Sequence, residues 1–245
     1  MKFVGIDNFK RMLTDDWFKV SLLNNIKFTL ISVPALIIVG LIFAYIINKL
    51  IYFGEAVRSM MFIPYIASVV AVCIVWMVMF QPNYGPINEF LRMVGVENPP
   101  GWLTSPKWSL YTITFIYIWQ QLGYYIIVYV AGLKSIPAEL YESAQIDGAS
   151  SVRQFFSITV PMVSPTTFFL TTMGIISSFK VFDHISVLTN GGPGNSSSVM
   201  AFYIYRTAFE NFQMGYANAL AWVLFIAIFI ITLLQMRGQA NFTAE

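Results

Sequence analysis

The chain carries FTLISVPALIIVGLIFAYIIN at residues 28–48, a run without any charge between Lys27 and Lys49. An α-helix needs roughly 20 such residues to cross the hydrocarbon core of a bilayer. Four more uncharged intervals of at least this length follow, and they lie between Arg58 and Glu89, Lys107 and Lys134, Arg153 and Lys180, and Glu210 and Arg237. The sequence therefore predicts a polytopic membrane protein.

The composition favours helices in lipid over a soluble helical bundle. Hydrophobic residues make up 57% of the 245 residues and charged residues only 11%, whereas roughly 25% of an ordinary soluble domain is charged. The apolar runs are continuous and do not alternate with polar residues, which favours helices over half-buried strands. The expected fold class is an all-α membrane protein with five transmembrane helices.

We expect these five spans at residues 26–47, 60–80, 110–133, 162–181 and 214–236. Residues 1–20 form a polar, amphipathic segment that is predicted to lie at the outer membrane interface as a lead-in. Residues 21–245 then form the transmembrane domain. The uncharged stretch 184–205 is not expected to span, because the backbone of its glycine-, proline- and serine-rich turn could not satisfy its own hydrogen bonds in lipid. An aromatic interfacial helix is predicted after that turn, at 198–210.

Charge and rare residues exclude several classes of function. A net charge of +2 without a basic block gives no reason to expect a nucleic-acid partner. Cys73 is the only cysteine and His184 the only histidine, so the chain alone cannot form a disulfide or a His/Cys metal cluster. The glycines at 191–194 lack the Lys of a phosphate-binding loop, and no Gly-Lys-Ser/Thr occurs anywhere in the chain.

A polar loop at residues 134–161 separates the third and fourth predicted spans. Ser135 can cap a short helix, and Pro137 suits its first turn. Glu139 and Glu142 suit the N-terminal end of that helix, where the positive end of the helix dipole favours acidic side chains. Gly148 is placed to end the helix. The loop is therefore predicted to hold one short, well-delimited helix.

One face of this helix is suited to contact with another protein. Leu140, Ala144 and Asp147 share that face at spacings of four and three residues. The small side chains of Ser143, Ala144 and Ala149 would let a second surface approach closely. The loop therefore favours a docking role.

The same loop resembles the EAA loop of ABC-importer permeases, whose pattern is Glu-Ala-Ala, three residues, Gly, nine residues and then Ile-x-Leu-Pro. Five residues match that pattern at its spacing: Glu142, Ala144, Gly148, Ile158 and Pro161. Ser143 stands where the pattern has its second Ala, and Val160 where it has Leu, and both changes keep the size class.

The resemblance covers nearly the whole chain and is closest to the carbohydrate-uptake branch of these permeases, the maltose, lactose, arabinose and glycerol-phosphate type. The phrases that carry it are FVGIDNF at 3–9, FIP at 62–64, IPAELYE at 136–142, DGA at 147–149 and LTNGGPG at 188–194.

This resemblance implies a permease subunit, not an enzyme, that translocates a sugar or sugar-like solute by alternating access. It implies no cofactor in this chain, with ATP and Mg held by a separate ATPase subunit. The partners it implies are a second permease subunit, cytoplasmic ATP-binding subunits, an extracytoplasmic solute-binding protein and membrane lipid. The positions implied to dock the ATPase are Leu140, Glu142, Ser143, Ala144, Asp147, Gly148 and Ala149.

The resemblance also implies a location in the cell membrane, with the N-terminus of this chain outside and the C-terminus cytoplasmic. That orientation places only five of the fourteen Lys and Arg residues inside, against the positive-inside rule. The family usually has six spans, and its FVGIDNF-type phrase usually follows the first of them. We therefore expect this chain to begin one helix late. A missing first helix would account for the low count of Lys and Arg residues on the inside.

Sugars favour aromatic faces and neutral hydrogen-bonding groups. Side chains of this kind within the predicted third and fifth spans are the candidates for the solute pathway: Trp119, Gln120, Gly123, Tyr124, Asn218 and Trp222. Interfacial aromatics and interhelical hydrogen bonds would explain many of the same residues.

Two other functions remain open from the sequence. A secondary transporter or channel for a small polar solute would be expected to place ionisable residues near mid-membrane, and the five uncharged intervals argue against it. An intramembrane enzyme would need paired carboxylates, a metal cluster or a nucleophile with its base, and the spans supply none of these.

Overall fold

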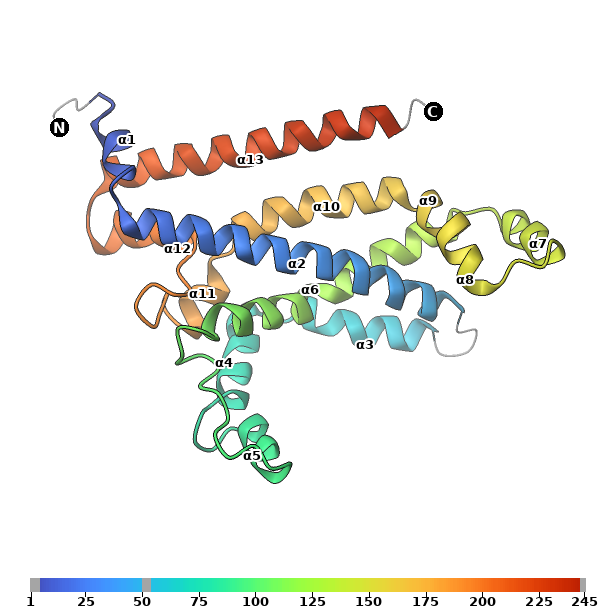
Figure 1. Ribbon diagram of the computed structural model, residues 1–245, viewed down its shortest axis with the longest axis horizontal. Helices are drawn as coiled ribbons and strands as arrows, with labels where there is room; N and C mark the ends of the chain where they lie inside the picture. Colours follow the sequence, from blue (N-terminus) through green and yellow to red (C-terminus); the bar gives the residue numbers. More distant parts are fainter. Residues whose placement is uncertain (1–4, 50–53, 243–245) are drawn as a thin grey trace. The chain divides into compact units, whose positions relative to one another are not determined.

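The protein is described here by a computed structural model, which covers residues 5–49 and 54–242 (Figure 1). Phe3 and Val4 of the FVGIDNF phrase and the last three residues lie outside the described part. Within that part the chain is helical and holds no strand. The elements are α1 (Asp7–Met12), α2 (Asp16–Lys49), α3 (Gly54–Ile66), α4 (Val69–Met79), α5 (Pro86–Met93), α6 (Ser109–Lys134), α7 (Ala138–Ile146), α8 (Ser151–Gln154), the π-helical turn η1 (Phe155–Thr159), α9 (Val160–Met162), α10 (Ser164–Phe179), α11 (Asp183–Leu188), α12 (Met200–Tyr205), the π-helical turn η2 (Arg206–Glu210) and α13 (Met214–Phe242).

Three helices are long and apolar enough to cross a membrane: Asp16–Asn48 of α2, Ser109–Lys134 of α6 and Met214–Arg237 of α13. Two further segments pass the same test only as bent pairs. The axis turns by 95° between α3 and α4, and by 64° between Ser151–Met162 and α10. The described residues therefore supply three continuous candidate spans, or up to five if each bent pair is one span.

The bend between α3 and α4 falls inside the segment predicted as one span at 60–80. Pro64 lacks an N–H donor, and its ring crowds the carbonyl four residues before it, so it weakens the last turn of α3. Ser68 then takes extended backbone angles, with φ −54° and ψ 127°, immediately before α4. The segment predicted as one span at 60–80 therefore holds parts of two separate helices.

Contacts between Cα atoms divide the chain into two compact units. The first unit comprises Met1–Ser32, Ser68–Tyr117 and Gly174–Glu245, and the second comprises Val33–Ala67 and Ile118–Met173. We describe each unit by itself.

In the first unit, Asp15 joins the start of α2 to α12 and α13. Its carboxylate accepts hydrogen bonds from the hydroxyls of Tyr203 and Tyr216, each at 2.5 Å, and from the backbone N–H of Trp17 at 2.9 Å and Phe18 at 3.2 Å. Burial alone would raise the pKa of Asp15, but these hydrogen bonds outweigh it and hold the pKa below its ordinary value. Asp15 thereby caps α2, which begins within the segment 1–20 predicted as the lead-in.

A row of polar side chains on α2 forms a second set of contacts in the first unit. The amide nitrogen of Asn24 donates to the carbonyls of residues 195, 196 and 198, at 3.0–3.2 Å. Asn25 donates to the carbonyl of Ser178 at 3.3 Å and accepts the backbone N–H of Met200 at 3.1 Å. These buried amides are satisfied, so they fix the 195–200 segment against α2.

In the second unit, glycines allow close helix contacts. A Cβ atom added to Gly123 of α6 would collide with the backbone carbonyl of Met61 in α3, and one added to Gly40 of α2 would lie 3.0 Å from the Cβ of Tyr125. The hydroxyl of Tyr129 donates to Thr167 of α10 at 3.1 Å. Small residues at helix crossings with occasional polar contacts are typical of membrane-embedded packing.

Candidate functional site

The polar loop 134–161 holds α7, which begins after Pro137. Pro137 itself lies at the cap position with φ −59° and ψ 131°. The predicted capping role of Ser135 is wrong, because its hydroxyl donates to the carbonyl of Gly132 at 2.8 Å. A serine three residues beyond a free carbonyl at a helix end bonds back to it readily, so Ser135 completes the last turn of α6.

The end of α7 is a Schellman motif built on Gly148, as the sequence predicted. Gly148 has φ +74°, a left-handed conformation that suits glycine. The N–H of Ala149 donates to the carbonyl of Ala144 at 2.8 Å, and the N–H of Gly148 donates to the carbonyl of Gln145 at 3.0 Å. The glycine is therefore required by the backbone path, and a Cβ added there would meet no atom within 4 Å.

None of the residues of α7 is buried within the described chain. The side chains of Glu142, Ser143 and Asp147 are exposed, and Leu140 is 40% exposed. Ala144 and Ala149 are half-buried. The most exposed large apolar side chain of α7 is Ile146, at 86%, which the sequence reading did not single out. The sequence held one signal for this exposure. Ile146 lies just before the predicted stop glycine, on a helix with little apolar surface of its own to bury.

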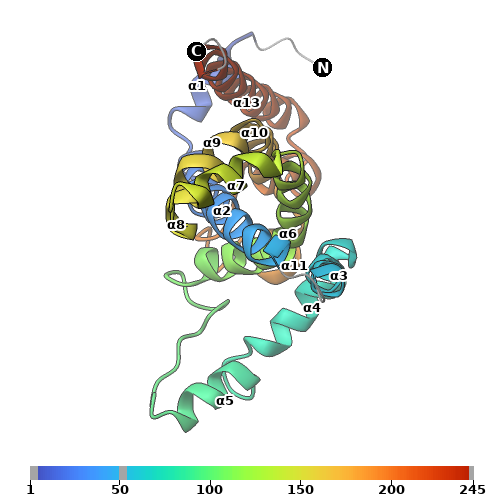
Figure 2. The same ribbon diagram turned by 90° about the vertical axis from the view of Figure 1, so that its right-hand side faces the viewer.

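Contacts within the second unit hold α7 in place. The hydroxyls of Tyr141 in α7 and Thr159 in η1 are hydrogen-bonded at 2.8 Å. The amide of Gln154 in α8 donates to the carbonyl of Ala149 at 2.9 Å, and Figure 2 shows α7 and α8 side by side. Tyr45 of α2 packs edge-on against Phe155 at 4.9 Å between ring centroids. These contacts link α7 to the rest of the loop 134–161, and they link the loop to α2.

The pathway candidates on α6 all lie in the second unit. Gln120 is buried and donates to the carbonyl of Ala67 at 3.4 Å. Tyr124 stacks on Tyr65 of α3 with 5.1 Å between ring centroids. Gly123 is covered by the α3 backbone, as described above, and Trp119 is partly exposed. The structure therefore gives Gln120, Gly123 and Tyr124 roles in packing α3 against α6.

The two candidates on α13 belong to the first unit. Asn218 and Trp222 are both exposed, and with Ala221 and Phe225 they line a shallow cavity of about 250 Å³. The structure brings these two residues together on one helix face. The shared solute pathway with the α6 residues stays a prediction.

Comparison with known proteins places the chain in a family. Residues 21–243 match the family described as "Binding-protein-dependent transport system inner membrane component". The probable ABC transporter permease protein YesP of Bacillus subtilis is 36% identical over 98% of this chain and 78% of its own length. The lactose transport system permease protein LacF of Rhizobium radiobacter is 34% identical over 96% of this chain and 80% of its own length.

A solved structure agrees with this assignment. The crystal structure of a bacterial alginate ABC transporter, in complex with its alginate pentasaccharide-bound periplasmic protein, contains a chain that superposes with a TM-score of 0.87 at 26% identity. The match covers 95% of this chain and 81% of that one. The family match, the relatives and this structure agree with the resemblance seen at residues 134–161. The chain therefore belongs to the family of inner membrane components of binding-protein-dependent transport systems.

Proposed function

We propose that this chain is a permease subunit of an ATP-binding-cassette importer and that it translocates a sugar or sugar-like solute by alternating access. The observation that carries the proposal is α7, an exposed short helix held between membrane-type helices in a chain of this family. The relatives' names supply the solute class, since they include permeases for lactose and for arabinooligosaccharides.

In this proposal, α7 is the coupling helix that docks in a cleft of a cytoplasmic ATPase subunit. The exposed Leu140, Glu142, Ser143 and Asp147 would form its contact surface. Gly148 would fix the angle at which the chain leaves that surface. Closure of ATPase subunits around ATP and Mg would thereby pull on the loop, and the contacts of Tyr141 and Tyr45 would pass the movement to the membrane helices.

We further propose five spans in this chain, counting each bent pair as one. Residues 1–20 would be the outer interfacial lead-in and 21–245 the transmembrane domain, with the loop 134–161 in the cytoplasm. The N-terminus would then lie outside and the C-terminus inside. A second permease subunit, cytoplasmic ATP-binding subunits and an extracytoplasmic solute-binding protein would complete the importer.

Uptake into proteoliposomes containing the full importer tests the function. We expect solute uptake only when both ATP and the solute-binding protein are supplied, and uptake driven by an ion gradient alone would overturn the proposal. Replacement of Glu142 by Ala should weaken ATPase docking and leave membrane insertion intact. Glu97→Ala is the matched control, because Glu97 is an equally exposed carboxylate outside the loop 134–161.

A further inference from the structure

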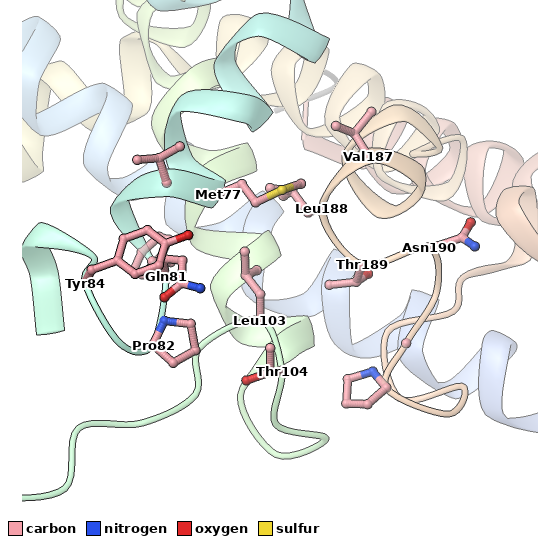
Figure 3. Close-up of a pocket in the computed structure, with 14 residues that line it drawn as sticks. Met77, Gln81, Pro82, Tyr84, Leu103, Thr104, Val187, Leu188, Thr189 and Asn190 are labelled. Atoms are coloured by element: carbon pink, nitrogen blue, oxygen red, sulfur yellow. The ribbon is translucent and has the colours of Figure 1, made fainter.

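A cavity lies in the first unit and is lined by none of the residues of the loop 134–161. Its volume is about 660 Å³, within the roughly 300–1,000 Å³ usual for small-molecule sites. Three segments form it: the C-terminal end of α4, the stretch 80–104 that follows, and the last residues of α11 (Asp183–Leu188) with the turn 189–193 after it. In Figure 3, Tyr84 and Gln81 lie on one side, Thr189 and Asn190 lie on the other, and Leu103 lies between them. None of the solute-pathway candidates contributes to this cavity.

The lining of this cavity is neutral. None of its fourteen lining residues, all of them in the described part of the chain, is an acid, a base or a histidine. A charged ligand would lose its hydration here without gaining an opposite charge. The lining therefore favours an uncharged ligand.

Several lining side chains have hydrogen-bonding groups that no other group of the described residues uses. Within the described residues, the side chains of Tyr84, Thr104 and Asn190 make no hydrogen bond, and Gln81 uses only its carbonyl oxygen, which accepts the N–H of Asn83 at 2.8 Å. An alkyl chain that covered these groups would strip them of water without compensation. A ligand rich in hydroxyls would replace that water with hydrogen bonds of its own.

The apolar part of the lining includes an aromatic platform. Tyr84 is 70% exposed, and its ring has no stacking partner among the described residues. The C–H face of a pyranose packs on such a ring, while its hydroxyls reach the groups around it. The rest of the apolar wall includes Met77, Leu103 and Leu188.

We propose that this cavity is a binding subsite for a neutral saccharide, formed by Tyr84, Thr104, Asn190 and Gln81 outside the membrane spans. The inference rests on the proposed function, because it takes the solute to be a sugar. It adds a place where that solute is held on the two segments that the proposed topology puts outside. The saccharide stacks on Tyr84 and hydrogen-bonds to the amides and the threonine hydroxyl.

Cysteine protection tests the subsite in the full importer. Cys73 is fully buried, so a maleimide should label an introduced cysteine first, and peptide mass spectrometry reads this chain alone. Lactose, maltose and arabinobiose are the probes. At a sugar concentration about ten times its dissociation constant, labelling of Thr104→Cys should slow about tenfold. Labelling of Glu97→Cys, an exposed site outside the cavity, should not change.

A second variant in the same background keeps the test specific. Tyr84→Ala should abolish the protection of Thr104→Cys, whereas Asn83→Ala, an exposed neighbour that does not line the cavity, should preserve it. The proposal is overturned if none of the three sugars slows labelling, if Glu97→Cys is protected equally, or if the solute-binding protein protects Thr104→Cys without sugar. Uptake measured on the same proteoliposomes keeps the two proposals apart, since ATP-dependent uptake without protection refutes the subsite alone.

Discussion

Replacement of Gly148 by Ala isolates the backbone geometry of the proposed coupling loop. Gly148 has φ +74°, and a Cβ atom added there meets nothing within 4 Å. The substitution therefore introduces no collision and removes no side-chain contact. Its cost is the left-handed conformation itself, about 1–2 kcal/mol for a residue with a Cβ atom. That cost corresponds to a factor of about 5–30 in an equilibrium constant.

We expect this conformational free-energy cost to weaken the docking of α7 to the ATPase subunit. If α7 must keep its Schellman ending to fit the ATPase, Gly148→Ala should weaken binding of the ATPase subunit to the membrane subunits by about 5- to 30-fold. Solute-stimulated ATP hydrolysis and uptake should fall together. Gly148→Asn should be milder, because asparagine tolerates the left-handed region better than other residues with a side chain. Titration of the ATPase subunit onto purified membrane subunits in nanodiscs measures the affinity.

Gly95 provides a matched control for this experiment. It has φ +94°, and a Cβ atom added to it also meets nothing within 4 Å. Gly95→Ala therefore carries a comparable backbone penalty at a site just after α5, outside the loop 134–161. The reasoning is refuted if Gly95→Ala weakens ATPase binding as much as Gly148→Ala, or if Gly148→Ala binds the ATPase with unchanged affinity.

Three further predictions concern the contacts that hold the helices together. Asp15→Asn should lower the free energy of unfolding by about 1.5–3 kcal/mol, because it removes charge-assisted hydrogen bonds. Because these hydrogen bonds lower the folded pKa of Asp15 below 3.8, their contribution is present above that pH, and the wild type should lose stability as the pH falls below 3.8 through the folded pKa. Burial and the hydrogen bond to Asp15 raise the pKa of Tyr203 to about 12. The contribution of Tyr203 to the free energy of unfolding should therefore be present below pH 10 and lost as the pH rises towards 12. Thermal unfolding in detergent checks the Asp15 statement as the pH falls from about 5 to about 2 and the Tyr203 statement as it rises from about 9 to about 12. A flat profile in either range would contradict the statement that belongs to it. Gly123→Ala should cost about 1–3 kcal/mol, because its Cβ atom meets the carbonyl of Met61 and α3 must shift; an unchanged unfolding temperature would contradict this contact. Asn24→Ala should speed amide hydrogen exchange in the 195–200 segment. Unchanged exchange there would show that the segment keeps its conformation without the hydrogen bonds of Asn24.

The sequence predicted those parts of the fold that depend on local physics. Long uncharged runs predicted α2, α6 and α13, because exclusion of charge from lipid is visible residue by residue. The left-handed end of α7 was likewise readable from Gly148, since few other residues take that conformation at low cost.

Contacts between distant residues could not be predicted. The close approach of α3 to Gly123 joins residues about 60 positions apart in the chain, and nothing near Met61 in the sequence indicates it. Asn24 and Asn25 bond to segments more than 150 residues away, and nothing near them in sequence names those partners. Ser135 was misassigned for a related reason, because both a helix end behind it and a helix start ahead of it could use its hydroxyl. The docking role of α7 remains a prediction, since it depends on another chain.

The row of amides on α2 makes the 195–200 segment a reporter of helix motion. Because Asn24 donates to the carbonyls of residues 195, 196 and 198 and Asn25 accepts the N–H of Met200, the segment cannot shift far unless the start of α2 shifts with it. A spin label or fluorophore at Asn195, whose backbone carbonyl is one of the tethered groups and whose φ is not positive, would then record the tilt of α2 during turnover. Such a probe would follow a membrane helix from a position in water.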